Sequence, residues 1–249
     1  MAKVSIITPC YNGAKYINKC IDSVLSQTFS DWEMLIIDDC STDNSVEIIH
    51  RYACEDSRIK YYRTDSPSGS PSQPRNIGID NATSRYIAFL DCDDIWCPRK
   101  LEEQLSIFEE RKCPLVFSNY EKISALGERS NRIVFAPPIV DIRRMYYGNP
   151  IGCLTVMVDT EITGKFHFKR MHHEDCIAWI ELITKFGPAY NTNSTLAYYR
   201  ESQGSVSRNK FKILSWQWNI YRKIFKFNTI KSVIYYVIYV YNGYKKYRI

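Results

Sequence analysis

The segment from Phe89 to Trp96 reads FLDCDDIW and continues an apolar run that begins with RYIA. The run predicts a buried strand, because its residues are apolar or favour strands. This strand ends at three carboxylates, Asp91, Asp93 and Asp94. At about 5 Å and an effective dielectric constant near 20, two unit charges repel by roughly 3 kcal/mol. The cluster therefore predicts a divalent cation with oxygen ligands, or else a solvated turn whose acids cap the next helix.

The composition fits one large domain, or one domain with an appendage. The chain has 249 residues, of which 45% are apolar, and this is enough for a sizeable core. Its net charge of +6 is unevenly distributed, because the segment from Ser202 onward contains ten Lys and Arg residues and no acid. The remainder therefore carries −4. Basicity is a property of the C-terminal tail.

The cysteines and the apolar segments indicate a cytosolic protein. Nine cysteines are scattered, odd in number and without a CxxC pair, which favours reduced thiols and argues against a zinc site. We expect most of them to be small core residues. The N-terminal MAKVSIITPCYNG does not resemble a signal peptide, and no stretch reaches the roughly 18 to 20 apolar residues of a membrane span. We therefore expect neither a cleaved signal nor a bilayer crossing.

Strand and helix patterns alternate through the first 120 residues. Expected strands cover residues 4–8, 32–37, 59–63, 85–90 and 115–118, and expected helices cover residues 17–25, 44–54, 76–82 and 98–110. Asn44 with Glu47 resembles a capping box, and Pro98 is suited to the first position of a helix. A strand over 154–158, a helix over 176–186 and a last strand over 196–200 follow. The pattern predicts an α/β fold with a mostly parallel, Rossmann-like sheet covered by helices.

Polar loops follow three of the expected strands. They read PCYNG, DDCSTDNS and DCDD, and ligands of open α/β sheets bind at the carboxyl ends of the strands. The first loop contains no GxGxxG and no GxxxxGK[ST], which argues against a dinucleotide dehydrogenase and a P-loop enzyme. We therefore expect any phosphate group to be held by a metal ion. A nucleotidylyltransferase is also disfavoured, because the first loop is not glycine-rich.

Five blocks together resemble the family-2 inverting glycosyltransferases with the GT-A fold. They are VSIITPCYNG, SQTFSDWEMLIIDDCSTDNS, PRNIGI, SRYIAFLDCDD and MHHEDCIAW, in the family's order over about residues 3 to 200. The resemblance implies transfer of a sugar from a nucleotide diphosphate donor, usually UDP-linked, with inversion at the anomeric carbon. It also implies help from Mg²⁺ or Mn²⁺.

The resemblance implies a uridine site in the first two loops. Pro9, Tyr11, Asn12 and Asp39 match the residues that hold the nucleoside in similar enzymes. The Asp39 carboxylate would accept from the uracil N–H, and Tyr11 would offer a flat face to the base. The alternative for Tyr11 is a half-buried aromatic residue at a strand end.

The resemblance implies that the DCDD loop binds ribose and metal. Asp91 and Cys92 are expected near the donor, and Asp93 is expected as the direct metal ligand with Asp91 sharing that role. The role of Asp94 is left open. Arg75 in the RN block is expected to neutralise donor phosphate. The family often has Ala where this chain has Pro74, so the start of that helix is less predictable.

Glu174 and Asp175 match the family's ED pair, in which the Asp is the general base. An inverting displacement needs one carboxylate that accepts the proton of the attacking hydroxyl. The alternative is that both acids only favour a helix N-terminus through the helix dipole. His172 and His173 are expected to be surface residues or acceptor contacts, not metal ligands. Ser205, Ser207 and Arg208 are expected on a lid over the diphosphate.

The tail predicts an association with membranes. We expect a catalytic domain over residues 1–205 and a helical tail over 206–249, whose Lys, Arg, Trp and Tyr content suits an interfacial helix on an anionic membrane. The alternative is that the tail packs on the domain. Nucleic acid is disfavoured as a partner, because the main body is acidic and lacks such a motif.

The combined interpretation is a cytoplasmic enzyme, peripheral on the inner face of the cytoplasmic membrane. We expect it to move a sugar from UDP-Gal, UDP-Glc or an N-acetylated analogue to a lipid-carrier-linked glycan of a bacterial O-antigen or capsule. The competing hypothesis is a non-catalytic protein that binds sugar nucleotides or serves as a scaffold in a polysaccharide assembly complex.

Overall fold

The computed structural model describes residues 2–201 and 210–247. Its first half is the predicted parallel sheet, in the order β3-β2-β1-β4. The bounds are β1 Val4–Cys10, β2 Trp32–Asp38, β3 Ile59–Arg63 and β4 Tyr86–Phe89. β1 and β2 are buried at every position, which is why the sequence shows continuous apolar runs there and not an alternating pattern.

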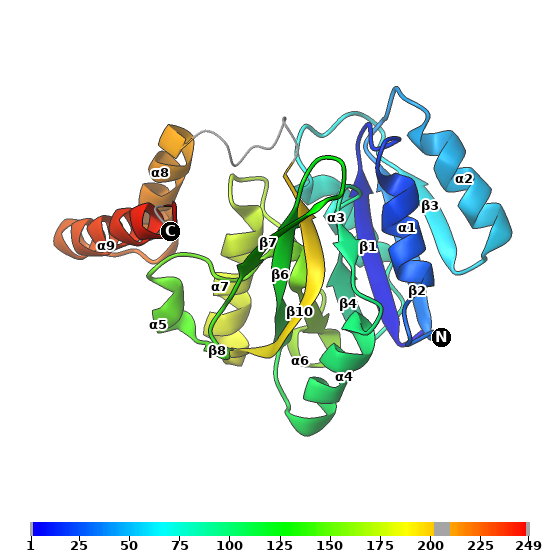
Figure 1. The fold of residues 1–249 in the computed structure, drawn as a ribbon. Coiled ribbons are helices and arrows are strands. Elements are labelled where there is room, and N and C mark those ends of the chain that lie inside the picture. Colours follow the sequence, from blue (N-terminus) through cyan, green and yellow to red (C-terminus); the bar gives the residue numbers. More distant parts are fainter. Residues whose placement is uncertain (1, 202–209, 248–249) are drawn as a thin grey trace.

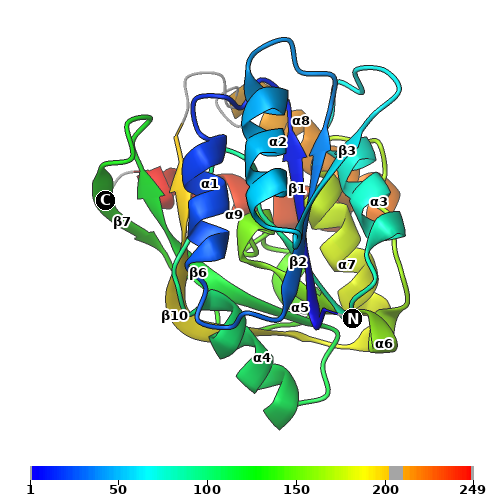
Figure 2. The same cartoon turned by 90° about the vertical axis from the view of Figure 1, so that its right-hand side faces the viewer.

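Helices cover both faces of this sheet (Figures 1 and 2). α1 Ile17–Leu25, α2 Ser45–Glu55 and α4 Lys100–Glu110 contribute to the core on one face, and α3 Ser72–Asn81 and α7 Glu174–Phe186 to the core on the other. Adjacent residues of β1 divide between the faces, because successive side chains of a strand alternate. Ile6 packs with the first set and Ile7 with the second.

The second half of the sheet is mixed in direction. The order continues from β4 through β9, β6 and β10 to β5. β9 is antiparallel to both β4 and β6, whereas β6 and β10 are parallel to each other. The bounds are β5 Ile95–Trp96, β6 Leu115–Ile123, β7 Arg129–Val134, β8 Ile139–Val140, β9 Met157–Asp159 and β10 Ala189–Arg200, with short helical turns α5 Ile142–Met145, η1 Cys153–Thr155 and α6 Thr160–Thr163.

The structure corrects several local predictions. The Asn44 capping box does not form; instead Asp43 Oδ1 accepts from the Ser45 N–H at 3.0 Å. Pro98 lies two residues before α4 and not at its first position. α3 begins at Ser72, four residues earlier than expected, so Pro74 lies within its first turn, where proline is tolerated. The strand expected over 154–158 is a 3₁₀ turn followed by β9.

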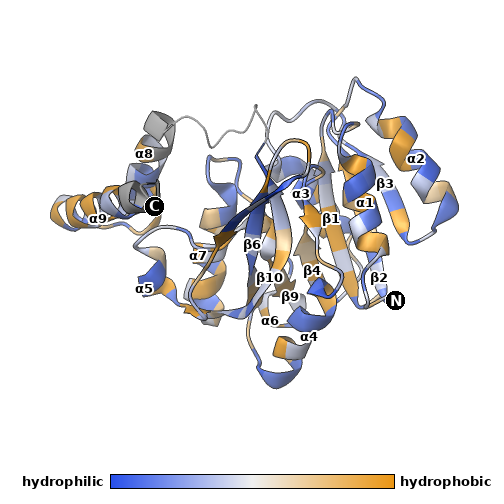
Figure 3. Cartoon of the chain, viewed as in Figure 1, coloured by the Kyte–Doolittle hydropathy of each residue, from blue (hydrophilic) through white to orange (hydrophobic). Residues whose placement is uncertain are grey.

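The tail is helical, as predicted. α8 Lys210–Asn219 continues into a π-helical turn, η3 Ile220–Ile224, and α9 Thr229–Tyr247 folds back beside it. Tyr221 attaches the tail to the main body, because its hydroxyl donates to the Tyr146 carbonyl at 2.9 Å. Figure 3 shows hydrophobic residues along α9. Within residues 2–201 and 210–247, no helix combines the length and hydropathy that a bilayer span needs.

All nine cysteines are free thiols, and five of them are buried, which agrees with the expected core role.

Candidate functional site

The three predicted polar loops meet at the carboxyl ends of the strands. The backbone N–H of Asn12 donates to Ser41 Oγ at 2.9 Å, and the side-chain Oδ1 of Asn12 accepts from the Thr42 N–H at 2.8 Å. A Cβ at Gly13 would come within 2.9 Å of Cys92 Sγ, so only glycine lets the first loop approach the DCDD loop this closely. The first loop thus contacts the second loop through Asn12 and approaches Cys92 of the DCDD loop at Gly13.

The residues expected to hold a nucleoside differ in their exposure. Tyr11 directly follows β1 and is 58% exposed, so part of its ring is accessible and its contact with a base stays a prediction. Pro9 lies within β1, paired with Ile37 of β2. Asp39 is buried, and its carboxylate accepts from Thr64 Oγ1 at 2.9 Å and from the backbone and hydroxyl of Ser68. It fixes the loop before α3, and its contact with a base stays a prediction.

The three acids of DCDD have three different environments. Asp91 Oδ1 accepts from Arg75 at 2.7 Å. Asp93 is partly buried, and burial followed by the charge of Asp91 raises its pKa to about 6. Asp94 is 1% exposed and accepts the Arg200 N–H at 2.8 Å. The alternative of a solvated capping turn is therefore wrong, because α4 has no side-chain cap and the last acid is internal.

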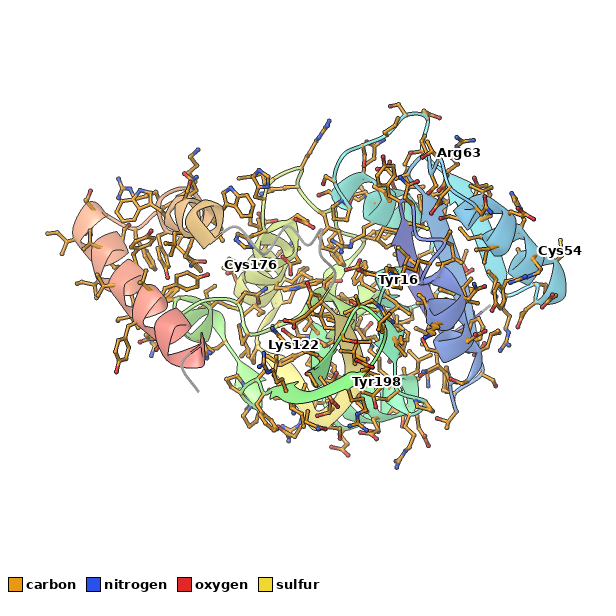
Figure 4. The ribbon with its side chains drawn as sticks, turned by 45° about the horizontal axis from the view of Figure 1, so that its top comes forward. Tyr16, Cys54, Arg63, Lys122, Cys176 and Tyr198 are labelled. Atoms are coloured by element: carbon orange, nitrogen blue, oxygen red, sulfur yellow. The ribbon has the colours of Figure 1, made fainter. Side chains whose placement is uncertain are left out.

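Arg200, which the sequence did not single out, fixes the DCDD loop. Its guanidinium is inaccessible to solvent, donates from Nε to the Asp93 carbonyl at 2.7 Å and lies 4.7 Å from the centre of the Tyr16 ring. Tyr16 is labelled in Figure 4. The sequence feature that could have identified Arg200 is its place at the end of the last expected strand, because a buried cation needs an acidic or carbonyl partner. Arg200 thus binds the backbone carbonyl of Asp93 and makes no hydrogen bond to its carboxylate.

Arg75 joins the DCDD loop to the start of α7. The residue is 3% exposed, and its guanidinium donates to Asp91 at 2.7 Å and to Glu174 at 2.9 Å. These two carboxylates hold its pKa well above the ordinary value, despite burial. Arg75 therefore compensates acids from two elements, while its expected contact with a donor phosphate stays a prediction.

Asp175 lies beside this bridge in the first turn of α7. Burial, followed by the charge of Glu174, raises its pKa to about 6. Cys176, the next residue, is labelled in Figure 4. A carboxylate with a pKa near neutrality is a competent general base. The structure thus brings Asp91, Glu174 and Asp175 together from segments more than eighty residues apart in the sequence.

The acids fit a hard divalent cation that shares its shell with a substrate. The Asp93 side chain forms no ion pair with the described residues, and the charge of Arg200 only partly offsets the rise in its pKa that burial and Asp91 cause. Among the residues that the structure describes, no group of three or more His, Cys, Asp or Glu side chains is arranged to enclose a metal ion. Mg²⁺ commonly uses one or two carboxylates together with substrate phosphates. A site at which the protein supplies only one or two of the metal ligands is therefore compatible with Mg²⁺.

Comparison with known proteins defines the family. A model of glycosyl transferase family 2 matches residues 5–158. The chain belongs to this family. TuaG of Bacillus subtilis, a candidate glycosyltransferase of teichuronic acid biosynthesis, is 38% identical over 98% of this chain and 96% of its own length. WfgD of Escherichia coli, a UDP-Glc:α-D-GlcNAc-diphosphoundecaprenol β-1,3-glucosyltransferase, is 36% identical over 98% of this chain and 94% of its own length.

Solved structures confirm the predicted GT-A fold of this glycosyltransferase. The S. aureus TarS fragment in complex with UDP-GlcNAc has a TM-score of 0.69 at 20% identity, covering 89% of this chain and 67% of that fragment. The mannosyltransferase PcManGT of Pyrobaculum calidifontis, in complex with GDP-Man and Mn²⁺, has a TM-score of 0.70 at 14% identity, covering 95% of this chain and 69% of that one.

We expect Asp175→Asn to stabilise the fold at alkaline pH. Folding raises the pKa of this carboxyl from 3.8 to about 6, which costs up to about 3 kcal/mol where the group is ionised in both states. The cost is complete above pH 6 and absent below pH 3.8. Urea unfolding should therefore show the variant to be more stable than the wild type at pH 8 and equal to it near pH 3.5. A stability gain of the same size at both pH values would contradict the assignment, and the exposed Asp80→Asn is the control.

Proposed function

We propose that this family-2 enzyme is an inverting, metal-dependent glycosyltransferase with a UDP-sugar donor. The observation that carries the proposal is the chain of contacts from Asp91 through Arg75 to Glu174, beside Asp175. It joins the expected donor and metal loop to the expected base. The donor sugar and the acceptor glycan would therefore bind next to the Arg75 guanidinium. The diphosphate would lie near Asp91, and the base Asp175 would lie near Glu174.

The reaction follows from the roles of these residues. Asp175 takes the proton of an acceptor hydroxyl as that oxygen forms its bond to the anomeric carbon. The bond from the same carbon to the diphosphate breaks, and UDP leaves with the electron pair. Attack opposite the leaving group inverts the anomeric centre, and one base suffices. Asp93 and Asp91 would hold Mn²⁺ or Mg²⁺, which supplies charge stabilisation for the leaving diphosphate.

The acceptor is proposed to be a lipid-carrier-linked glycan of a bacterial surface polysaccharide. WfgD is named for an acceptor on diphosphoundecaprenol and TuaG for teichuronic acid biosynthesis, and both align over almost the whole chain. These names support a lipid-linked acceptor and UDP-Glc as a candidate donor. UDP-Gal, an N-acetylated analogue and a place in O-antigen or capsule assembly remain part of the proposal. A screen of UDP- and GDP-sugars for Mn²⁺-dependent release of the nucleotide would identify the donor.

The tail, which we assign to residues 206–249, is proposed to hold the enzyme on the inner face of the cytoplasmic membrane. α9 exposes an aliphatic stripe at helical spacing, which comprises Ile230, Val233, Ile234, Val237 and Val240. Its other side packs inward, since Tyr235 contacts Tyr146 and Ser232 is fully buried. The packing alternative therefore holds for one face of α9, and the other face stays available for the proposed contact with lipid.

Exposed basic residues between α8 and α9 would add to the attraction of an anionic membrane. Arg222, Lys223 and Lys226 are exposed, and the segment from Ser202 onward contains no acid. Each basic residue near an anionic surface contributes about 1 kcal/mol. Apolar and electrostatic contributions would act together, as they do for interfacial helices.

Transfer by Asp175→Asn tests the catalytic role. We expect kcat to fall by about 100- to 10,000-fold, the usual contribution of a general base, with donor binding retained. In the wild type, kcat/KM should rise with pH through about 6, because the base acts only when ionised. UDP release with acceptor present measures both. Full activity of the variant would refute the base. The non-catalytic hypothesis predicts instead that the wild type itself releases no UDP with acceptor present.

Asp93→Ala tests the metal ligand. We expect UDP affinity measured by calorimetry to rise with Mn²⁺ in the wild type and to lose that response in the variant, because this carboxylate would hold the cation that supplies charge stabilisation for the diphosphate. Asp22→Ala, on α1 and hydrogen-bonded to Tyr52, is the matched acidic control. An unchanged Mn²⁺ response in Asp93→Ala would exclude this residue as the ligand.

Sedimentation with lipid vesicles tests the tail. We expect binding to vesicles that contain phosphatidylglycerol, weaker binding at high salt, and a loss of about tenfold or more in Val233→Asp/Val237→Asp. Ser130→Asp/Ile133→Asp on β7 is the control, since it adds the same two negative charges at exposed positions outside the tail. Equal binding by the stripe variant and the wild type would rule out α9 as the lipid-binding face.

A further inference from the structure

The start of α7 is weakly held by its own residues. His173, the N-cap, has φ 60° in the left-handed region, where a residue other than glycine is strained. No side chain caps the helix there. The His173 Nε2 is buried without a hydrogen bond to any described residue, and burial lowers the pKa of the ring, which favours the neutral form. The position of Asp175, two residues later, must therefore depend on contacts from elsewhere.

One residue of the tail supplies these contacts. The Trp216 indole on α8 stacks on His172 with ring centres 4.0 Å apart and planes 12° apart. It also meets His173 edge to face at 5.2 Å and 81°. A stacked pair of aromatic rings contributes about 0.5–1.5 kcal/mol beyond the area that it buries. The same indole thus packs against both residues that lead into α7.

On the other side, the start of α7 is held by the Arg75–Glu174 ion pair at 2.9 Å. The helix start therefore lies between a guanidinium from α3 and an indole from α8. The first contact fixes Glu174 and the second fixes the two histidines, so Asp175 is held from both directions. Loss of the Arg75–Glu174 ion pair or of the Trp216–His172 stack would allow His173 to leave its strained left-handed conformation.

We propose that Trp216 is a positioning residue for the base, and that α8 is therefore a working part of the active site. The proposal rests on the proposed role of Asp175. Trp216 does not touch the reacting atoms; it acts through His172 and His173, keeping the turn in its left-handed conformation. Displacement of a catalytic group by about 1 Å can cost up to about 100-fold in rate. The expected signature is a loss in kcat without a matching loss of donor binding.

Hydrogen exchange tests the structural part of the proposal without any turnover. In Trp216→Ala, we expect the amides of residues 170–176 to exchange faster than in the wild type by about tenfold or more. Trp218→Ala is the matched control, because its indole contacts Tyr236 of α9 at 5.5 Å and is not part of the histidine contacts. Equal protection of residues 170–176 in Trp216→Ala and the wild type would overturn the proposal, as would the same loss of protection in both variants.

Steady-state kinetics test the functional part. We expect Trp216→Ala to lower kcat by about 10- to 100-fold with the donor KM within about threefold of the wild type. Trp216→Phe, which keeps a stacking ring, should recover most of the rate, and Trp218→Ala should keep it. His172→Ala should add little to the loss in Trp216→Ala, because both remove one stacked pair. A wild-type kcat in Trp216→Ala, or no recovery in Trp216→Phe, would overturn the proposal.

The two proposals fail in different ways. An active Asp175→Asn enzyme refutes the base, whatever Trp216 does to hydrogen exchange. An inactive Asp175→Asn enzyme together with a fully active Trp216→Ala enzyme refutes only the positioning role.

Discussion

One buried guanidinium sets the electrostatics of the whole site. Arg75 pairs with Asp91 from the DCDD loop and with Glu174 from α7, so a single positive charge opposes two carboxylates. Burial, followed by the charge of the neighbouring acids Asp91 and Glu174, raises the pKa of Asp93 and of Asp175 to about 6, and the nearby arginines offset this only in part. The protein accepts this repulsion at the cost of stability. A site with an excess of negative charge is suited to a cation on one side and to a base on the other.

Much of the first half of the fold could be predicted from local patterns. β1 to β4 and the helices α1 and α2 follow from apolar runs and helical periodicity, since each forms within a short segment. The second half could be predicted only in part. The helix α7 and segments of β6 and β10 were expected, whereas the other strands depend on distant partners. β9 is three residues long and is stabilised between β4 and β6, which no local pattern records. The two-residue strand β5 exists only because it pairs with β10, about one hundred residues later.

The same division holds for the site. The positions of Asp91, Asp93 and Asp175 were predictable, because each lies in a motif at the end of a strand or at the start of a helix. The role of Asp94 was not, since its partner Arg200 follows 106 residues later and the contact uses the backbone N–H of that arginine. Arg75, Asp91 and Glu174 were each singled out, but the pairing of Arg75 with the two acids was not, because motifs identify residues and not their pairings. Trp216 was seen only as part of an interfacial tail.

The tail has two surfaces that do not compete. The aliphatic stripe lies on α9, and the indole that contacts the histidines lies on α8. Tyr221 joins the two helices, since its hydroxyl lies 2.9 Å from the Tyr146 carbonyl of the main body and 3.3 Å from the Tyr235 carbonyl of α9. Lipid bound to the stripe would therefore leave the contact with His172 intact. Tyr221 fixes the position of α9 relative to α8. If the tail binds the membrane as proposed, the turn before Asp175 would therefore keep a constant distance from the membrane surface.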